Sequence, residues 1–230
     1  MDIARFLQIY IIQGGFALFF LYMAYIVLKR GKKRANLYLS GFYLSNTIGA
    51  IINIIYANIF EETIVYILHF ATYYFLCFSL AFLLIFILIL LKPPSKINKR
   101  IQFLFLLLFG LILLGLLFIP SGIIINQSTN WKPDWSWIFL ICSIIVCSGM
   151  AIFPISYYSI KIYKKLGNVQ LKRKWKYFLI GVSAYFFLYY GTSLSNTLNN
   201  DTFRFFWSLI SLPTLISLYL IYHGVGRQLE

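Results

Sequence analysis

Long runs of apolar residues, separated by short basic or polar links, dominate the chain. Each run holds about 18 to 28 residues, enough for one helix to cross the hydrocarbon core of a bilayer, which is roughly 30 Å thick. No link is long enough to divide the 230 residues into separate parts. The pattern therefore predicts one all-α membrane domain over residues 1–230, a bundle of seven transmembrane helices. The predicted spans are 6–28, 36–56, 64–91, 101–119, 137–163, 178–196 and 205–222.

Composition agrees with this hydrophobic pattern. The chain is 61% hydrophobic and only 11% charged, with a mean hydropathy of +0.82, whereas about a quarter of the residues of a soluble domain are charged. All five Trp residues lie at or near predicted helix ends, where indole rings prefer the headgroup layer. We expect an integral protein of the cell (plasma) membrane.

Basic residues are divided unevenly between the two sets of links. With the N-terminus outside, the links 29–34, 92–100 and 161–176, together with Arg227, place 17 of the 20 Lys and Arg residues in the cytoplasm. The outer links then hold Arg5, Lys132 and Arg204. The acidic residues Asp2, Glu61, Glu62, Asp134 and Asp201 are outside and Glu230 is inside. Because basic residues near helix ends stay in the cytoplasm, the sequence predicts an outer N-terminus and a cytoplasmic C-terminus.

The net charge of +14 suggests partners for the inner side. The charge is spread over juxtamembrane links without a nucleic-acid-binding motif, so we expect no nucleic-acid partner. Anionic lipid of the inner leaflet is the simpler partner for such links. The link at 161–176 carries seven basic residues and is the natural surface for a cytoplasmic or membrane signalling partner.

Polar residues within the apolar runs point to an inward-facing helix surface. Asn46, Gly49 and Asn53 recur at i, i+3 and i+7 and therefore share one helix face. An amide without a partner in hydrocarbon costs several kcal/mol, so this face must reach other helices or water. Two interpretations remain: hydrogen bonds that join helices around small residues, or a site for a ligand or water.

Counting depth at 1.5 Å per residue gathers polar side chains in the outer halves of several predicted helices. Together they predict an outward-opening cavity with aromatic walls and a few hydrogen-bonding groups, suited to a small-molecule or lipid ligand. The alternative is that these side chains only cross-link the bundle. The candidate ligand-binding residues are Gln13, Asn46, Asn53, His69, Thr72, Tyr73, Tyr190 and Ser193.

The sequence lacks the usual chemistry of enzymes and pumps. All six carboxylates fall in tails or links, so no acid is placed for proton relay or intramembrane proteolysis. Ser193 and His69 alone do not make a hydrolase, and small-residue packing is the simpler role for Ser193. We predict no enzyme activity, no metal site and no cofactor. The three cysteines, all within apolar spans, are expected to be small buried residues: Cys77, Cys142 and Cys147.

Two segments carry a family resemblance. "LKRKWKYFLIG" at 171–181 combines a basic run, an aromatic-aliphatic step and a glycine, and "SLYLIYHGVGRQL" at 217–229 ends the last helix. With seven helices and an outer N-terminus, the chain resembles the N-terminal seven-transmembrane sensor region of prokaryotic histidine kinases. The resemblance implies a membrane sensor whose last helix leads to a cytoplasmic catalytic module. Only "HGVGRQLE" follows Tyr222, with no phosphoacceptor helix, so we expect a sensor without a kinase.

These observations favour a standalone seven-helix receptor or sensor that binds a small or lipophilic ligand from outside and signals through its basic cytoplasmic face. One alternative is a permease or channel-like protein for a small neutral or anionic solute, which requires a continuous polar path. The other is a structural or assembly subunit of the membrane. Pro154 and Pro213 each remove a backbone hydrogen bond, which permits helix kinks.

Overall fold

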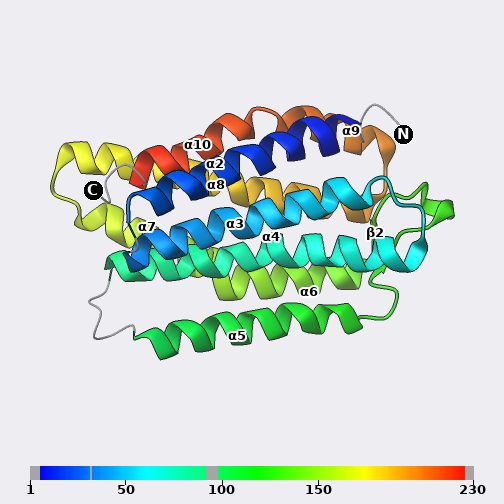
Figure 1. Cartoon of the computed structure of the whole chain (residues 1–230), viewed down its shortest axis with the longest axis horizontal. Coiled ribbons are helices and arrows are strands. Elements are labelled where there is room, and N and C mark those ends of the chain that lie inside the picture. The colour runs from blue at the N-terminus through cyan, green and yellow to red at the C-terminus, as the bar shows by residue number, and fades with distance from the viewer. Residues whose placement is uncertain (1–5, 32, 92–97, 226–230) are drawn as a thin grey trace.

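The computed structural model describes residues 6–31, 33–91 and 98–225, and this part of the chain is all-α apart from two short strands (Figure 1). The elements in chain order are η1 (Leu7–Gln13), α2 (Gly14–Lys29), α3 (Arg34–Tyr56), α4 (Glu62–Leu91), α5 (Lys99–Gly115), η2 (Leu116–Phe118), β1 (Ile123–Ile124), η3 (Gln127–Thr129), β2 (Asp134–Trp135), α6 (Trp137–Cys147), η4 (Ser148–Ile152), α7 (Phe153–Lys165), α8 (Val169–Leu198), α9 (Asp201–Ser211) and α10 (Thr214–Val225). Of these, η1 and η4 are π-helical, whereas η2 and η3 are 3₁₀ turns.

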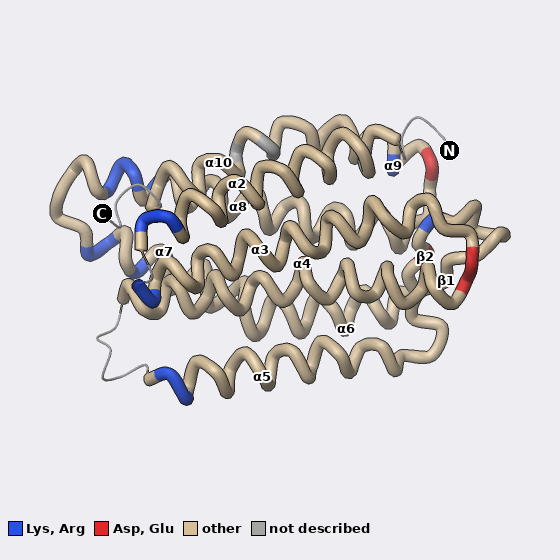
Figure 2. The backbone as a smooth tube through the Cα atoms, in the orientation of Figure 1, with Lys and Arg blue, Asp and Glu red and all other residues tan. Residues whose placement is uncertain are grey.

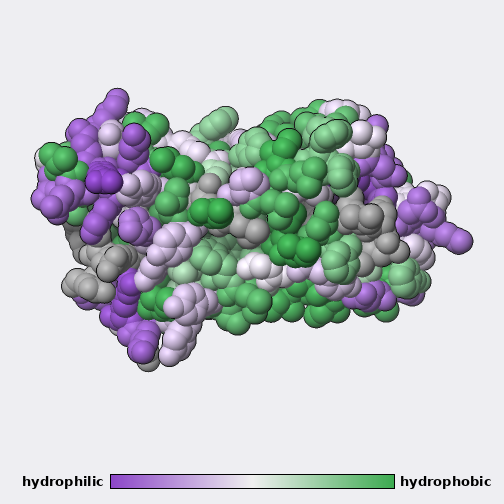
Figure 3. All heavy atoms as spheres, turned by 90° about the horizontal axis from the view of Figure 1, so that it is seen from above, coloured by the Kyte–Doolittle hydropathy of each residue, from purple (hydrophilic) through white to green (hydrophobic). Residues whose placement is uncertain are grey.

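Within the described part of the chain, six helical segments are long and apolar enough to cross a membrane, which is consistent with an integral membrane protein. Hydrophobic residues cover the middle of the molecule and hydrophilic residues gather at its two ends (Figure 3). The segments are Ile9–Lys29, Arg34–Tyr56, Glu62–Leu91, Lys99–Phe118, Trp137–Lys165 and Val169–Leu198. They agree with the first six predicted spans, except that the sixth begins well before residue 178.

The early start of α8 corrects the prediction of a long inner link up to Lys176. Helix α7 ends at Lys165 and α8 begins at Val169. The Asn168 side chain caps α8 by accepting hydrogen bonds from the backbone N–H groups of Gln170 (2.8 Å) and Leu171 (3.2 Å). Lys and Arg are good helix formers, so this basic segment continues the helix beyond the apolar span.

The predicted continuous helix at 205–222 is wrong. The chain forms α9 and α10 instead, separated at Leu212 and Pro213. Proline has no backbone N–H and its ring clashes with the preceding helical turn, so it favours a break here. Neither part alone has the length of a membrane span. The predicted exit beyond the last helix, with Arg227 and Glu230, lies outside the described residues.

The predicted outer link at 120–136 folds into a small β-hairpin. Its strands β1 and β2 are antiparallel, with Ile123 opposite Trp135 and Ile124 opposite Asp134. The connecting turn η3 is capped by Asn126, whose side chain accepts hydrogen bonds from the backbone N–H groups of Ser128 and Thr129. Trp135 is buried, so the hairpin packs onto the end of the helices.

Charge separates the two ends of the bundle (Figure 2). We call the end that holds 29–31, 33–34, 99–100 and 161–176 the basic end, and the end that holds the hairpin and Glu61, Glu62, Asp134 and Asp201 the hairpin end. Several residues used for the charge prediction lie outside the described part of the chain: Asp2, Arg5, Lys32, Lys92, Lys96, Arg227 and Glu230.

Side chains near the basic end are tightly packed. Phe86 and Phe178 are fully buried and lie in ring contact. Helix α10 approaches α8 so closely that a Cβ atom on Gly224 would lie 2.5 Å from the backbone nitrogen of Phe178 and 2.7 Å from the carbonyl oxygen of Lys174. Only glycine permits this approach, so the second part of the broken helix is closely joined to α8.

Candidate functional site

A cavity of about 730 Å³ lies between the helices in the half of the molecule next to the hairpin. Its walls come from η1 and α2, from α3, α4 and α8, and from α9 and α10, with the hairpin at one end. This volume falls within the roughly 300–1,000 Å³ of small-molecule sites. Most of the wall is apolar, including Ile12, Phe16, Phe20, Leu188 and Leu218.

The structure brings together most of the residues that the sequence predicted for a ligand site. Seven of them line the cavity: Gln13, Asn46, Asn53, His69, Thr72, Tyr73 and Ser193. Tyr190 is not part of the described wall, and its hydroxyl lies 2.7 Å from the Ser148 hydroxyl instead. That these residues bind a ligand stays a prediction.

Helices α3 and α4 are antiparallel and close together along the predicted small-residue face. A Cβ atom on Gly49 would lie 3.0 Å from the Leu76 side chain and 3.1 Å from the Thr72 carbonyl oxygen. Nearer the hairpin, the Tyr56 hydroxyl lies 2.8 Å from Nδ1 of His69. These two contacts fix the register of the helices, and this register places Asn53 opposite Thr72.

A hydrogen-bonded group closes the cavity toward the basic end. The Tyr185 hydroxyl donates to Asn46 Oδ1 (2.7 Å) and lies 2.8 Å from the Ser79 hydroxyl. The Asn46 amide nitrogen donates to the Phe42 carbonyl oxygen (2.8 Å). We call Asn46, Ser79 and Tyr185 the floor of the cavity. Both polar groups of Asn46 are engaged, and the Tyr185 hydroxyl joins α8 to α3 and α4.

His69 connects the helices to the hairpin. Trp135 donates its indole N–H to Nε2 of His69 (3.0 Å). An indole nitrogen can only donate, so Nε2 carries no proton, and the neutral ring then donates from Nδ1 to the Tyr56 hydroxyl. His69 is therefore engaged on both ring nitrogens, and neither bonds the Ser193 hydroxyl. This arrangement differs from a serine hydrolase, in which the histidine contacts the nucleophile.

A second polar chain crosses the wall between α4, α6 and α8. The Tyr73 hydroxyl donates to the Ser143 hydroxyl (2.7 Å), which lies 2.8 Å from the hydroxyl of Tyr189. Each of these groups has a partner within the chain. They support the interpretation of polar residues as connections between helices.

Asn53 and Thr72 differ from these fully engaged groups. The Asn53 amide nitrogen donates to Gln13 Oε1. The Asn53 side-chain oxygen and the Thr72 hydroxyl, however, are buried without a hydrogen-bond partner among the described residues. The two residues are only 4% and 5% exposed. A buried oxygen without a partner costs about 1–3 kcal/mol, so these two groups lower the stability of the bundle.

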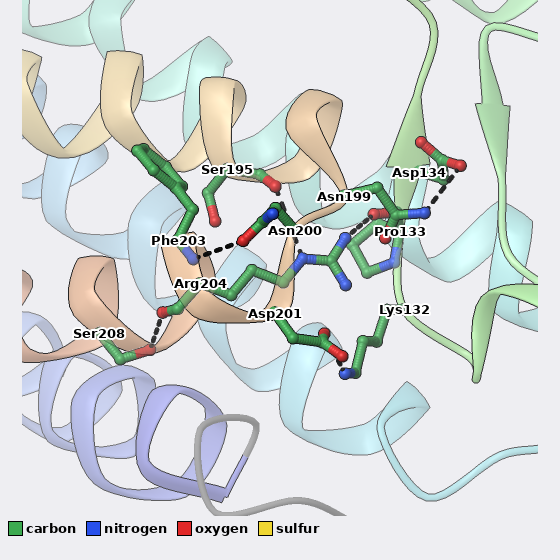
Figure 4. Close-up of polar contacts among 10 residues, drawn as sticks. All are labelled: Lys132, Pro133, Asp134, Ser195, Asn199, Asn200, Asp201, Phe203, Arg204 and Ser208. Carbon is green, nitrogen blue, oxygen red and sulfur yellow. Dashed lines mark hydrogen bonds and ion pairs between the residues drawn. The ribbon is translucent and has the colours of Figure 1, made fainter.

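Charged residues surround the hairpin end of the cavity (Figure 4). Arg204 on α9 is buried and donates to the carbonyl oxygen of Pro133 (2.6 Å), and Lys132 forms an ion pair with Asp201 (2.6 Å). Asn199 donates to Asp134 of the hairpin (3.0 Å). These contacts join the hairpin to the α8–α9 connection beside the cavity.

Sequence reasoning missed Arg204, which it assigned to an outer link. The helical spacing of α9 could have indicated its position, because one face of this helix carries four residues that are all buried: Arg204, Trp207, Ser208 and Ser211. The opposite face exposes apolar residues, including Phe206. In a lipid environment this arrangement turns the polar face of α9 inward, toward the cavity.

Cysteine and metal chemistry contribute no recognisable site. Cys77 and Cys147 are buried, Cys142 is half-buried, and all three are free thiols. The described residues contain no group of three His, Cys, Asp or Glu side chains placed to hold a metal ion.

Comparison with known proteins yields no family model, no curated protein and no solved structure that matches the chain. The functional argument therefore rests on the residues and geometry of this protein.

Proposed function

We propose that the protein is a seven-helix membrane receptor that binds a small lipophilic molecule in the cavity and signals from its basic end. The chain crosses the membrane seven times in this proposal, the last time as the broken helix α9–α10. The N-terminus is outside and the C-terminus is in the cytoplasm. The protein acts by binding, without enzymatic chemistry or a cofactor.

The orientation is supported by the separation of charge. The basic end gathers most of the described Lys and Arg residues (Figure 2). Basic residues near helix ends remain in the cytoplasm, where they also attract anionic lipid. The cavity then faces the outer side of the cell membrane, and the segment 161–176 faces a cytoplasmic or membrane signalling partner.

The observation that carries the proposal is a cavity closed by the floor and followed by a packed core. Beyond the floor, Phe42 and Tyr43 are fully buried. Polar side chains closer to the basic end bond to nearby backbone: Asn36 donates to Gly31 (2.9 Å) and Ser40 to Ala24 (3.2 Å). A permease needs a polar path across the membrane, and this packing favours a receptor over that alternative.

A route for signalling is offered by the broken helix. Helix α9 contributes Phe205 and Ser211 to the cavity, and α10 contributes Leu218 before it packs against α8 at Gly224. The break at Leu212–Pro213 gives α10 a point about which to turn. A ligand that moves α9 or α10 would therefore displace the basic end of the bundle.

Hydrogen–deuterium exchange in lipid nanodiscs, with and without each member of a broad panel of lipophilic compounds, tests the proposal. We expect an active compound to slow exchange in α3 and α4 beside the cavity and to change exchange at 161–176. Protection of the cavity alone would contradict signalling. If no compound of the panel had an effect, solute flux in liposomes would support the permease instead. A stable co-purifying protein would support the structural subunit.

A further inference from the structure

The charged residues of the cavity wall lie at one end of the cavity. Among the described lining residues, charges occur at Lys132, Asp201 and Arg204, all beside the hairpin. Toward the floor the described lining is uncharged, and the Phe20 ring contacts the buried core there through Phe42. A cavity with one charged end and one uncharged, mostly apolar end is suited to an amphiphile, a molecule with a polar head and an apolar chain.

The two cations of this wall are more deeply buried than its acid. Lys132 and Asp201 form an ion pair, but the Lys132 side chain is only 13% exposed, whereas that of Asp201 is 76% exposed. Arg204 is 8% exposed and donates to the Pro133 carbonyl oxygen. Water screens an exposed charge much more strongly than a buried one. The described wall therefore presents a positive potential to the cavity at this end, and its charges sum to +1.

The other described acidic residues of the hairpin end do not belong to this wall. The Asp134 carboxylate accepts a hydrogen bond from Asn199 (3.0 Å). Glu61 accepts hydrogen bonds from backbone N–H groups at the start of α4. Glu62 lines a different pocket, beside the turn η3. These carboxylates are engaged elsewhere, so they do not reverse the sign of the potential in the cavity.

Lys132 can bond a ligand directly, whereas Arg204 acts through its charge. An ammonium group carries three N–H donors, so Lys132 can donate to an anion in the cavity while it keeps Asp201. The Arg204 side chain is enclosed and directed to the hairpin (Figure 4). Its charge still acts over several ångströms, because the effective dielectric constant within a protein is about 20. A carboxylate, with one negative charge, complements the wall better than a phosphate, which carries about two.

We infer that the cavity selects a long-chain carboxylate, with its head beside Lys132 at the hairpin end and its chain extending toward Phe20 and the floor. This inference rests on the proposed function and adds the chemical class of the ligand. The head then lies at the outer surface of the membrane and the chain lies at the depth of the hydrocarbon. An amphiphile in the outer leaflet has the same orientation.

Three nitroxide-labelled probes separate the effect of charge from the orientation of the chain. In 5-doxylstearate the nitroxide, which quenches tryptophan, is close to the carboxylate, and methyl 5-doxylstearate is the uncharged equivalent. In 16-doxylstearate the nitroxide is near the far end of the chain. Trp131 and Trp135 line the cavity. The saturable part of the quenching, measured at alkaline pH in phosphatidylcholine nanodiscs at equal bilayer mole fraction, therefore reports binding.

We expect 5-doxylstearate to bind about tenfold more tightly than its methyl ester and to quench more at saturation than 16-doxylstearate. Lys132→Gln should lower the preference for the acid to about threefold or less, whereas Asp201→Asn should raise it. Both substitutions break the same ion pair, so a purely structural effect would change the preference in the same direction. Lys99→Gln, which alters an exposed charge at the basic end, should leave the preference unchanged.

Equal binding of the acid and its ester, or the absence of saturable quenching, would overturn the inference. So would a preference that changes in the same direction in Lys132→Gln and Asp201→Asn, or one that falls equally in Lys99→Gln and therefore reflects the net charge of the protein. Stronger quenching by 16-doxylstearate would contradict the position of the head. In each case the exchange experiment still decides the proposed receptor function separately, because its panel includes uncharged compounds.

Discussion

The helices pack differently in the two halves of the molecule: closely near the basic end, and around a cavity near the hairpin. Near the basic end, α10 packs closely against the backbone of α8 at Gly224, and the buried rings of Phe86 and Phe178 lie in contact. Near the hairpin, α9 is separated from α10 by a break and η1 is π-helical, and a cavity of about 730 Å³ remains. The floor residues mark the boundary. The comparison indicates that regular helices pack one half closely, whereas interrupted helices leave room in the other.

The largest effect is expected from a change in the packed half. Gly224→Ala would force a methyl group against the backbone of Phe178 and Lys174, and overpacking of this kind costs about 3 kcal/mol. We expect a clear fall in the thermal midpoint in detergent. Gly115→Ala is the matched control, because no atom lies within 4 Å of the added Cβ. If both variants melted alike, the contrast in packing would be refuted.

A second, smaller effect is expected at the hairpin. His69→Leu leaves the buried Trp135 indole N–H without its acceptor, at a cost of about 2 kcal/mol. Thermal unfolding should show the loss, and the hairpin at 122–136 should exchange deuterium faster. If deuterium exchange became faster only in α4, the result would contradict the connection between His69 and the hairpin. Trp137→Phe serves as the control, because this neighbouring ring is exposed.

A substitution in the floor should have an intermediate effect on stability, because the floor lies at the boundary between the two halves. Tyr185→Phe removes the donor to Asn46 Oδ1 and the partner of Ser79, and we expect a loss of about 1.5 kcal/mol. In a double-mutant cycle with Asn46→Leu, the double variant should lose less stability than the sum of the two single losses, by an energy of the same order. Strict additivity of the two substitutions would mean that the floor is not a connected group.

The smallest effect should have the opposite sign. Thr72→Val replaces a buried hydroxyl that has no partner among the described residues, so the ligand-free protein should gain about 0.5 kcal/mol. Ser143→Ala is the contrasting change, because that hydroxyl bonds Tyr73 and its loss should destabilise. Destabilisation by Thr72→Val would show that the hydroxyl already has a structural partner.

Much of the fold follows from the hydrophobic pattern, because six of the seven predicted spans correspond to described helices long enough to cross a membrane. The interruptions were harder to anticipate. Pro213 indicated a kink, and the structure interrupts the helix at Leu212 and Pro213, between α9 and α10. Similarly, Trp175 and Trp207 were expected at the membrane interface, yet both are buried and donate to Ser159 and Thr192.

The candidate site was predictable where depth and helical spacing determine position. The face of Asn46, Gly49 and Asn53 turns inward as expected, because an amide in hydrocarbon needs a partner. Tyr190 was assigned to the cavity by height alone, and its direction around α8 turns it to Ser148 instead. Arg204 was missed because its burial depends on the hairpin that covers it.

The π-helical turn at Ser148–Ile152 changes the direction in which side chains point along the fifth long helical segment, Trp137–Lys165. Ser143 meets Tyr189 of α8, and sixteen residues later the Ser159 carbonyl accepts a hydrogen bond from Trp175 of the same helix (2.8 Å). At about 100° per residue, a regular α-helix would turn these two positions roughly 160° apart. A π-helical turn absorbs about one extra residue, which reduces the angle to roughly 60°. Deletion of one residue at Gly149 would therefore leave a regular α-helix with the same angle of roughly 60°, so both ends of this segment would still face α8.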